Sequence, residues 1–346
     1  MNKRIYILYT GGTIGMQRSE QGYVPMPGLA DLIAQKMPIH LSANMPDYEL
    51  EELDHLIDST NATPADWRTI ASRIRDNYDQ YDGFVVLHGT DTLAYTASAL
   101  SFMLQDLTKP VIVTGSQIPL CELRNDAQDN LITTLVLARN YPIPEVLLYF
   151  NGRLLRGNRA TKVKASGFDA FDSPNFPWLG QVGIHIEIKQ HLTRPCADKP
   201  RFELPSYGKQ RIITLKLFPG IDAQFLRHLL NQPLDGLILE SFGVGNAPDR
   251  ETEFLQLLQQ ANDQGVVIVN RSQCIQGRVD HSSYATGLAL AQTGVISGYD
   301  MTLEAAFCKL HHLLASGLDQ DQVRQQMQVS LCGELTPAKP KSDSQS

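Results

Sequence analysis

The sequence contains few cysteines, and no pairing pattern connects them. The five are scattered and form no CxxC pair: Cys121, Cys196, Cys274, Cys308 and Cys332. Small secreted domains depend on closely spaced, evenly numbered cysteines, and this chain of 346 residues lacks that framework. We therefore expect a cytoplasmic protein in a reducing compartment.

Long apolar runs are absent as well. No stretch approaches the ~18 apolar residues that a membrane-spanning helix needs. Residues 1–4 lead directly into a short apolar segment, without the apolar core of a secretory signal. Positive charge is also scarce, since the net charge is −7 and lysines and arginines form no cluster. These absences argue against a membrane partner and against a nucleic-acid partner.

Motifs for cofactors and metal ions are missing too. Gly11, Gly12 and Gly15 fit neither a P-loop nor a dinucleotide fingerprint, and no G-x-S-x-G nucleophile elbow occurs. Asp126 and Asp129 have helical spacing, which is more typical of a solvated helix face than of a metal site. The sequence predicts no cofactor and no metal.

What is present is an alternation of strand-like and helix-like segments. Short Val/Ile/Leu runs between amphipathic stretches are typical of a parallel sheet that helices cover on both faces. Because 346 residues exceed what one core usually organises, we predict a two-domain α/β fold. It would have a larger N-terminal, doubly wound, mostly parallel sheet and a smaller C-terminal α/β domain. Predicted strands span residues 5–8, 84–87, 111–113, 146–150, 212–217, 234–239 and 266–269, and the clearest helices span residues 28–37, 64–78, 93–104, 130–139, 303–316 and 319–331.

Prolines mark the boundary between the two domains. Pro195, Pro200 and Pro205 lie close together among polar residues, which is typical of a linker. We predict an N-terminal α/β domain, a linker, a C-terminal α/β domain and a disordered tail, over residues 1–192, 193–210, 211–336 and 337–346.

Three predicted strands end in loops that combine glycine with threonine or serine. These loops are residues 10–15, 88–92 and 114–117, and residues 58–60 add a carboxylate and two hydroxyls. Because the carboxyl ends of parallel strands share one edge of a sheet, we expect one small polar pocket suited to a small zwitterion. Thr13 lies among glycines with uncovered backbone N–H groups, as a nucleophile beside an oxyanion site requires.

A threonine hydroxyl is a weak nucleophile and needs a neighbouring group to activate it. His88 is one candidate base, although a hydrogen-bonded structural role fits it at least as well. A lysine can act in this way when its surroundings keep the amine neutral, and residues 156–162 end in Lys162. From the sequence of that segment alone, we favour a charged surface loop.

Two of these loops together resemble the signature motifs of the L-asparaginase family, in particular its bacterial cytoplasmic type I enzymes. They are Thr10-Gly11-Gly12-Thr13-Ile14-Gly15 and His88-Gly89-Thr90-Asp91-Thr92. The resemblance covers nearly the whole chain up to about Pro337. It continues through residues 58–60, 114–119, 156–159, 162 and 243–246.

The resemblance implies hydrolysis of L-asparagine to L-aspartate and ammonia through a threonine acyl-enzyme. It makes Thr13 the expected nucleophile, with Thr90 as its rival, in a catalytic set of Thr13, Tyr23, Thr90, Asp91 and Lys162. It places Ser59 at the substrate's α-carboxylate and Asp91 at its α-ammonium, in a binding set of Asp58, Ser59, Thr60, Gly89, Thr90 and Asp91. Residues 17–27 would form a lid that brings Tyr23 to Thr13 on closing.

The resemblance also implies a homotetramer, a dimer of dimers, with active sites near subunit interfaces. Residues 277–287 correspond to the loop that would reach the neighbouring site. An allosteric asparagine site is expected around Glu240, Ser272, Gln273 and Cys274. Glu240 stands where the family pattern has an arginine, and its carboxylate would repel an effector's carboxylate. This departure weighs against positive cooperativity.

Three alternatives stay open from the sequence. An amidotransferase subunit that supplies ammonia resembles asparaginase but carries an added N-terminal domain, whereas the first strand here begins at residue 5. A non-catalytic amino-acid sensor would not need the complete catalytic set. Asparagine and glutamine differ by one methylene, worth only ~1–3 kcal/mol, so the sequence does not rank these two substrates.

Overall fold

The chain divides into two compact units, residues 1–208 and residues 209–346. The computed structural model describes residues 3–20, 22–36, 46–250, 252–281 and 284–337. The division between the units falls within the segment 193–210. All but the first residue of the tail predicted at 337–346 lie outside the described residues.

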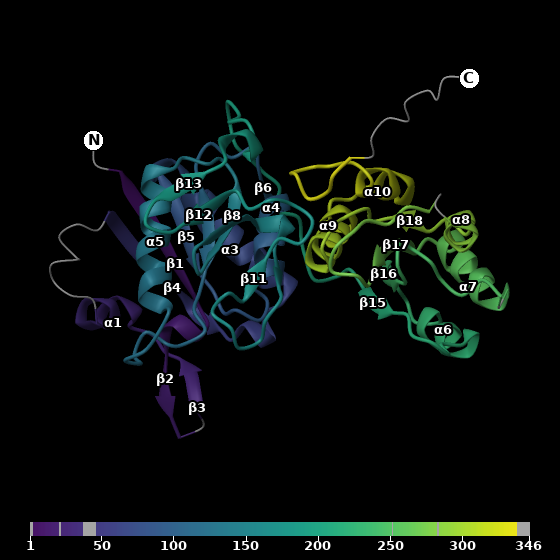
Figure 1. The fold of residues 1–346 in the computed structure, drawn as a ribbon, viewed down its shortest axis with the longest axis horizontal. Helices are drawn as coiled ribbons and strands as arrows, with labels where there is room; N and C mark the ends of the chain where they lie inside the picture. Colours follow the sequence, from purple (N-terminus) through teal and green to yellow (C-terminus); the bar gives the residue numbers. More distant parts are fainter. Residues whose placement is uncertain (1–2, 21, 37–45, 251, 282–283, 338–346) are drawn as a thin grey trace. The chain divides into compact units, whose positions relative to one another are not determined.

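A mostly parallel sheet forms the centre of the first unit (Figure 1). Its eight described strands have the order β13-β12-β9-β8-β7-β5-β1-β4. Five pair in parallel: β8 (Val146–Phe150), β7 (Val111–Thr114), β5 (Gly83–Leu87), β1 (Arg4–Gly11) and β4 (Asp47–Ile57). The antiparallel remainder is β9 (Arg153–Arg156), β12 (Gly180–Val182) and β13 (Ile186–Ile188).

Helices cover both faces of this sheet because its strands are apolar on both sides. Ile5 and Ile7 of β1 pack with residues of α1 (Leu29–Lys36) and α5 (Ala127–Asn140). Tyr6 points to the opposite face, the side of α3 (Pro64–Asn77) and α4 (Leu93–Met103) (Figure 1). Burying each such large side chain stabilises the unit by about 1.5–3 kcal/mol.

Short elements connect these layers. The 3-10 turns are η1 (Thr13–Gly15), η2 (Ser59–Asn61), η3 (Tyr78–Gln80), η4 (Gly157–Arg159) and η5 (Gln190–Leu192). Three two-stranded ribbons pair β2 (Met16–Ser19) with β3 (Gly22–Pro25), β6 (Leu104–Gln105) with β14 (Arg201–Phe202), and β10 (Thr161–Lys162) with β11 (Phe171–Asp172). The polar segment 17–27 is thus largely a β-hairpin, which its composition did not indicate.

The second unit has a smaller parallel sheet of four described strands. They are β15 (Ile212–Lys216), β16 (Gly236–Ser241), β17 (Val267–Ser272) and β18 (Ile296–Ser297). One face packs on α6 (Ala223–Leu230), α7 (Thr252–Asp263) and α8 (Ala285–Gln292), and the other on α9 (Leu303–Ala315) and α10 (Gln320–Met327). Helix α10 ends earlier than the predicted residue 331. No helix in the described residues is long and apolar enough to cross a membrane.

Candidate active site

Three loops meet at the carboxyl edge of the first sheet, and glycines allow the contact. Gly12 follows β1 and has a φ of 83°. It packs so closely against the loop after β5 that a Cβ added to Gly12 would lie 2.2 Å from the Gly89 nitrogen. A Cβ on Gly89 would lie 2.5 Å from the Ser59 Oγ. Residues after β1, β4 and β5 therefore share one small region. A larger residue at Gly12 would displace the backbone of residues 88 and 89, and one at Gly89 would displace the Ser59 side chain.

Thr13 stands at the start of η1, half-buried beside this contact. The opposite loop is fixed by its own polar groups: the Thr92 hydroxyl donates to the Ser59 carbonyl at 2.8 Å, and Ser59 is buried. The Asp58 carboxylate accepts a hydrogen bond from the Thr60 N–H at 3.2 Å, which caps η2. Asp58, Ser59 and Thr60 thus form one ordered turn next to Gly89.

Lys162 lies against the loop that follows β5. Its ammonium donates to the Thr90 hydroxyl oxygen at 2.9 Å and to the Asp91 carboxylate at 2.7 Å. Thr90 is buried and Asp91 is exposed, so the lysine connects an enclosed hydroxyl with a solvated carboxylate. Tertiary structure therefore joins three side chains that the sequence separates widely.

The surface-loop interpretation of residues 156–162 is wrong. Arg156 is buried and forms an ion pair with Glu145, with its Nε 2.6 Å from the carboxylate. Asn158 and Arg159 are also buried, and the Arg159 guanidinium lies over the Phe176 ring. The two arginine charges are buried with partners, which anchors the segment that leads to Lys162.

His88 has a structural role. Its Nδ1 donates to the Gly89 carbonyl at 2.8 Å, because a carbonyl can only accept. Its Nε2 therefore accepts from the Thr96 hydroxyl at 3.0 Å. Burial lowers the pKa of His88, and both ring nitrogens are occupied by this packing.

Gln117 and Asp126 are two residues whose roles the sequence did not reveal. The Thr90 hydroxyl donates to the Gln117 Oε1 at 3.2 Å. Asp126 is buried and accepts backbone N–H bonds from Gln117 and Ile118, each at 2.9 Å. The prediction of a solvated face is wrong for Asp126, whereas Asp129 is exposed. An acidic residue at a helix start that follows a loop is a weak signal for such an anchor.

Tyr23 lies on β3, which packs beside η1. Its hydroxyl donates to the Glu122 carboxylate at 2.6 Å, and the Arg18 Nε donates to the Tyr23 oxygen at 3.1 Å and to Glu122 at 3.0 Å. These contacts hold the hairpin against the loop after β7. The hydrogen bond from Tyr23 lowers the pKa of Glu122, which keeps this carboxylate ionised.

The four candidate allosteric residues gather in the second unit, at the ends of β16 and β17. Glu240 is mostly buried and pairs with Arg271 on the neighbouring strand at 2.5 Å. The amide of Gln273 donates to the Glu240 carbonyl at 2.9 Å, and the Cys274 N–H donates to the Ser272 Oγ at 3.0 Å. The Glu240 charge is therefore neutralised by Arg271, a partner that the repulsion argument did not include.

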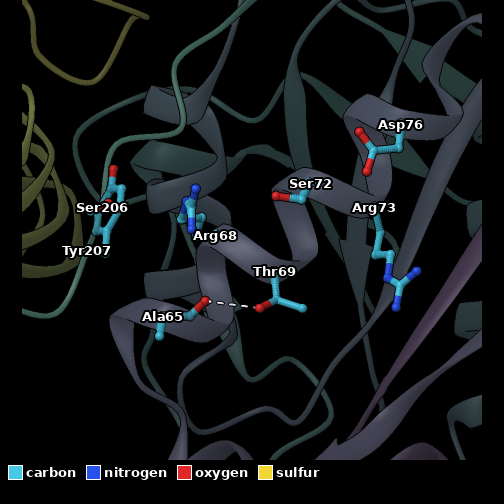
Figure 2. Close-up of a pocket in the computed structure, with 8 residues that line it drawn as sticks. All are labelled: Ala65, Arg68, Thr69, Ser72, Arg73, Asp76, Ser206 and Tyr207. Atoms are coloured by element: carbon cyan, nitrogen blue, oxygen red, sulfur yellow. Dashed lines mark hydrogen bonds between the residues drawn. The ribbon is translucent and has the colours of Figure 1, made fainter.

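A separate hollow of about 440 Å³ lies along α3 (Figure 2). Its lining residues are Ala65, Arg68, Thr69, Ser72, Arg73, Asp76, Ser206 and Tyr207, and none belongs to the sets described above. Its guanidinium groups already have partners, since Arg68 donates to the Leu204 carbonyl and Arg73 pairs with Glu51. Within the described residues, no group of His, Cys, Asp and Glu could hold a metal ion.

Two family models match the chain. The model described as Asparaginase, N-terminal matches residues 4–194, and the model described as Glutaminase/Asparaginase C-terminal domain matches residues 211–327. The chain belongs to the asparaginase family. L-asparaginase 1 of Escherichia coli strain K12 is 55% identical to it over 337 residues, which cover 97% of this chain and 98% of that protein.

Solved structures of asparaginases share the fold. L-asparaginase I from Vibrio cholerae matches with a TM-score of 0.88 and 49% identity over 97% of this chain and all of that one. The thermostable L-asparaginase from Thermococcus kodakarensis matches with a TM-score of 0.87 and 32% identity over 97% of this chain and all of that one. The predicted family and fold class are confirmed.

Proposed function

We propose that this chain is an L-asparaginase that hydrolyses L-asparagine to L-aspartate and ammonia. The observation that carries the proposal is the contact of Lys162 with Thr90 and Asp91, beside the meeting point of Gly12 and Gly89. The identity of 55% to L-asparaginase 1 of Escherichia coli supports it over nearly the full length of both chains.

The proposed reaction begins with attack of the Thr13 hydroxyl on the side-chain amide carbon of asparagine. The Thr13 proton passes to the departing nitrogen, and ammonia leaves a β-aspartyl ester. The Tyr23 phenol would carry this proton after exchanging its hydrogen bonds with Arg18 and Glu122 for one with the Thr13 hydroxyl. Water then cleaves the ester and regenerates Thr13. Backbone N–H groups of Gly89 and Thr90 are suited to bind the oxyanion, an effect worth about 2.7–4 kcal/mol per donor in other enzymes.

Charge decides how the substrate would be oriented. The exposed Asp91 carboxylate can bind the α-ammonium group, because only an ionised partner compensates that charge. Ser59, within the turn of Asp58 and Thr60, can donate to the α-carboxylate. No cofactor enters this scheme. A non-catalytic sensor would leave the Lys162 contact without a purpose, whereas an ammonia-supplying amidotransferase subunit would also hydrolyse an amide and is not set apart by this contact.

The proposal also covers the domain bounds, the location and the oligomeric state of the protein. We propose domains at residues 1–192 and 211–336 joined by a linker at 193–210, in a cytoplasmic homotetramer that binds neither nucleic acid nor membrane. Residues 277–287, some of which lie outside the described residues, would complete a neighbouring active site. Light scattering after gel filtration tests this assembly, and a monomer with full activity would contradict it.

An ammonia-release assay tests the proposed function. Wild-type protein is compared on L-asparagine, L-glutamine and D-asparagine, with aspartate quantified alongside ammonia. Stoichiometric ammonia and aspartate from L-asparagine are expected. Binding without release would favour the sensor, and faster turnover of glutamine would make the chain a glutaminase.

A second experiment separates the two threonines. Thr13→Ala should keep asparagine binding by calorimetry and lose turnover by at least about 10⁴-fold, as expected when a nucleophile is removed. Acid quenching followed by peptide mass spectrometry should find the β-aspartyl ester on the peptide that contains Thr13. An ester on the Thr90 peptide instead would move the nucleophile there.

A further inference from the structure

The orientation of the Gln117 side-chain amide is fixed by its neighbours. Its Nε2 lies 3.1 Å from the Ala165 carbonyl oxygen and 3.0 Å from the Gly167 carbonyl oxygen. Carbonyl oxygens only accept hydrogen bonds, so the NH₂ end must face them. The Oε1 of Gln117 must therefore face Thr90, at 3.2 Å.

This orientation sets the direction of every hydrogen bond at Thr90. The Gln117 Oε1 can only accept, so the single hydroxyl proton of Thr90 is donated to it. The lone pairs of the Thr90 oxygen then accept from the Lys162 ammonium at 2.9 Å. The same ammonium also donates to the Asp91 carboxylate at 2.7 Å. Hydrogen bonds thus run in one direction, from Lys162 through Thr90 to Gln117.

The backbone of Gln117 is held as firmly as its side chain. Its N–H donates to the buried Asp126 carboxylate at 2.9 Å, and the neighbouring Ile118 N–H donates to the same group at 2.9 Å. A side chain fixed at both ends presents its Oε1 at one position. Such an acceptor selects one rotamer of Thr90, because the hydroxyl must reach Gln117 and Lys162 together.

We infer that Gln117 is a positioning residue of the proposed asparaginase site, acting through Thr90. It accepts the hydrogen bond of the Thr90 hydroxyl and thereby leaves the Thr90 oxygen as a hydrogen-bond acceptor toward Lys162. This inference rests on the proposed function. A hydroxyl whose proton is held by an amide oxygen, not by a base, is a poor nucleophile. The arrangement therefore leaves acylation to Thr13 and gives Thr90 a supporting role.

Two substitutions separate this role from simple anchoring of residues 165–167. Gln117→Met has similar length but offers no acceptor to Thr90 and no donor to the two carbonyls. Gln117→Glu keeps an oxygen acceptor for Thr90 and loses the donors to Ala165 and Gly167. If Gln117 positions Thr90, the glutamate variant retains the Thr90 rotamer and the kcat that the methionine variant loses. If Gln117 only anchors the loop, both variants lose them to the same extent.

Two readouts are measured on wild type and both variants, after tryptophan fluorescence has shown that each is folded. Threonine-methyl NMR reports the Thr90 rotamer, with its signal assigned by its loss in Thr90→Ser, and needs no turnover. Steady-state kinetics with L-asparagine give kcat and KM separately. We expect Gln117→Met to average the Thr90 rotamer and to lower kcat about five-fold with KM little changed, as for one lost neutral hydrogen bond. Gln117→Glu should keep the single rotamer and most of kcat.

The outcomes distinguish this inference from the function on which it rests. A wild-type protein that releases no ammonia overturns the proposed function, while the NMR comparison still shows whether Gln117 orders Thr90. An unchanged Thr90 rotamer in Gln117→Met, or equal losses of kcat in the two variants, overturns the role of Gln117.

Discussion

Replacing Asp126 by alanine should destabilise the first unit by about 3 kcal/mol and reduce turnover. The Asp126 carboxylate is buried and accepts the backbone N–H groups of Gln117 and Ile118, each at 2.9 Å. Hydrogen bonds to a charged group contribute about 1.5–3 kcal/mol each, so two of them contribute about 3–6 kcal/mol. Gln117 and Ile118 are only half-buried, and water can solvate the released N–H groups, which favours the lower end of that range.

Urea unfolding followed by tryptophan fluorescence measures this loss selectively. Trp67 and Trp178 are the two tryptophans of the chain, and both belong to the first unit. Asp129→Ala is the matched control, because Asp129 is exposed on the same helix and should change stability by less than about 0.5 kcal/mol. A loss below about 1 kcal/mol for Asp126→Ala, or one equal to the control, would refute the anchoring argument.

Three further predictions concern the lid, the second unit and pH. Tyr23→Phe should lower kcat for asparagine about 10²-fold or more, as for a lost proton carrier, and intact ammonia release would remove Tyr23 from the catalytic set. Glu240→Arg should cost about 3 kcal/mol in urea unfolding because it breaks a mostly buried ion pair with Arg271, and an unchanged midpoint would contradict this expectation. Burial lowers the pKa of His311 to about 4 in the folded protein. As the pH falls, His311 is therefore protonated in the unfolded chain before it is protonated in the folded protein. Stability should therefore fall from about pH 6.5 towards pH 4, by about 2 kcal/mol at pH 5, and His311→Gln should flatten this part of the profile measured by circular dichroism.

Much of the fold was predictable because its strands are apolar runs buried on both faces. Residues 84–87 and 146–150 could hardly be anything but central strands between helices. β4, by contrast, is an edge strand with alternating acidic residues, so its composition carries no such signal. The hairpin strands β2 and β3 also lack an apolar pattern, because their residues are partly or fully exposed.

The site, like the fold, could be predicted only where its residues have a local signal in the sequence. The glycine loops and Thr13 are local in the sequence, and their motifs could be read directly. The sequence indicates no role for the partners Gln117 and Glu122, because a single amide or carboxylate has no local signature. The surface position expected for Arg156 and Arg159 is wrong, since the carboxylate and the aromatic ring that they contact are not adjacent to them in the sequence.

The sequence by itself determined the family, the α/β class and the identities of the reactive side chains, because motifs and apolar periodicity are local properties. Only the tertiary structure decided which of those side chains touch. It joined Lys162 to Thr90 and Asp91, directed the Thr90 proton to Gln117, and neutralised Glu240 with Arg271. Hydrogen bonds and ion pairs depend on distances of a few ångströms between distant segments, and those distances are set by how the helices pack on the sheets.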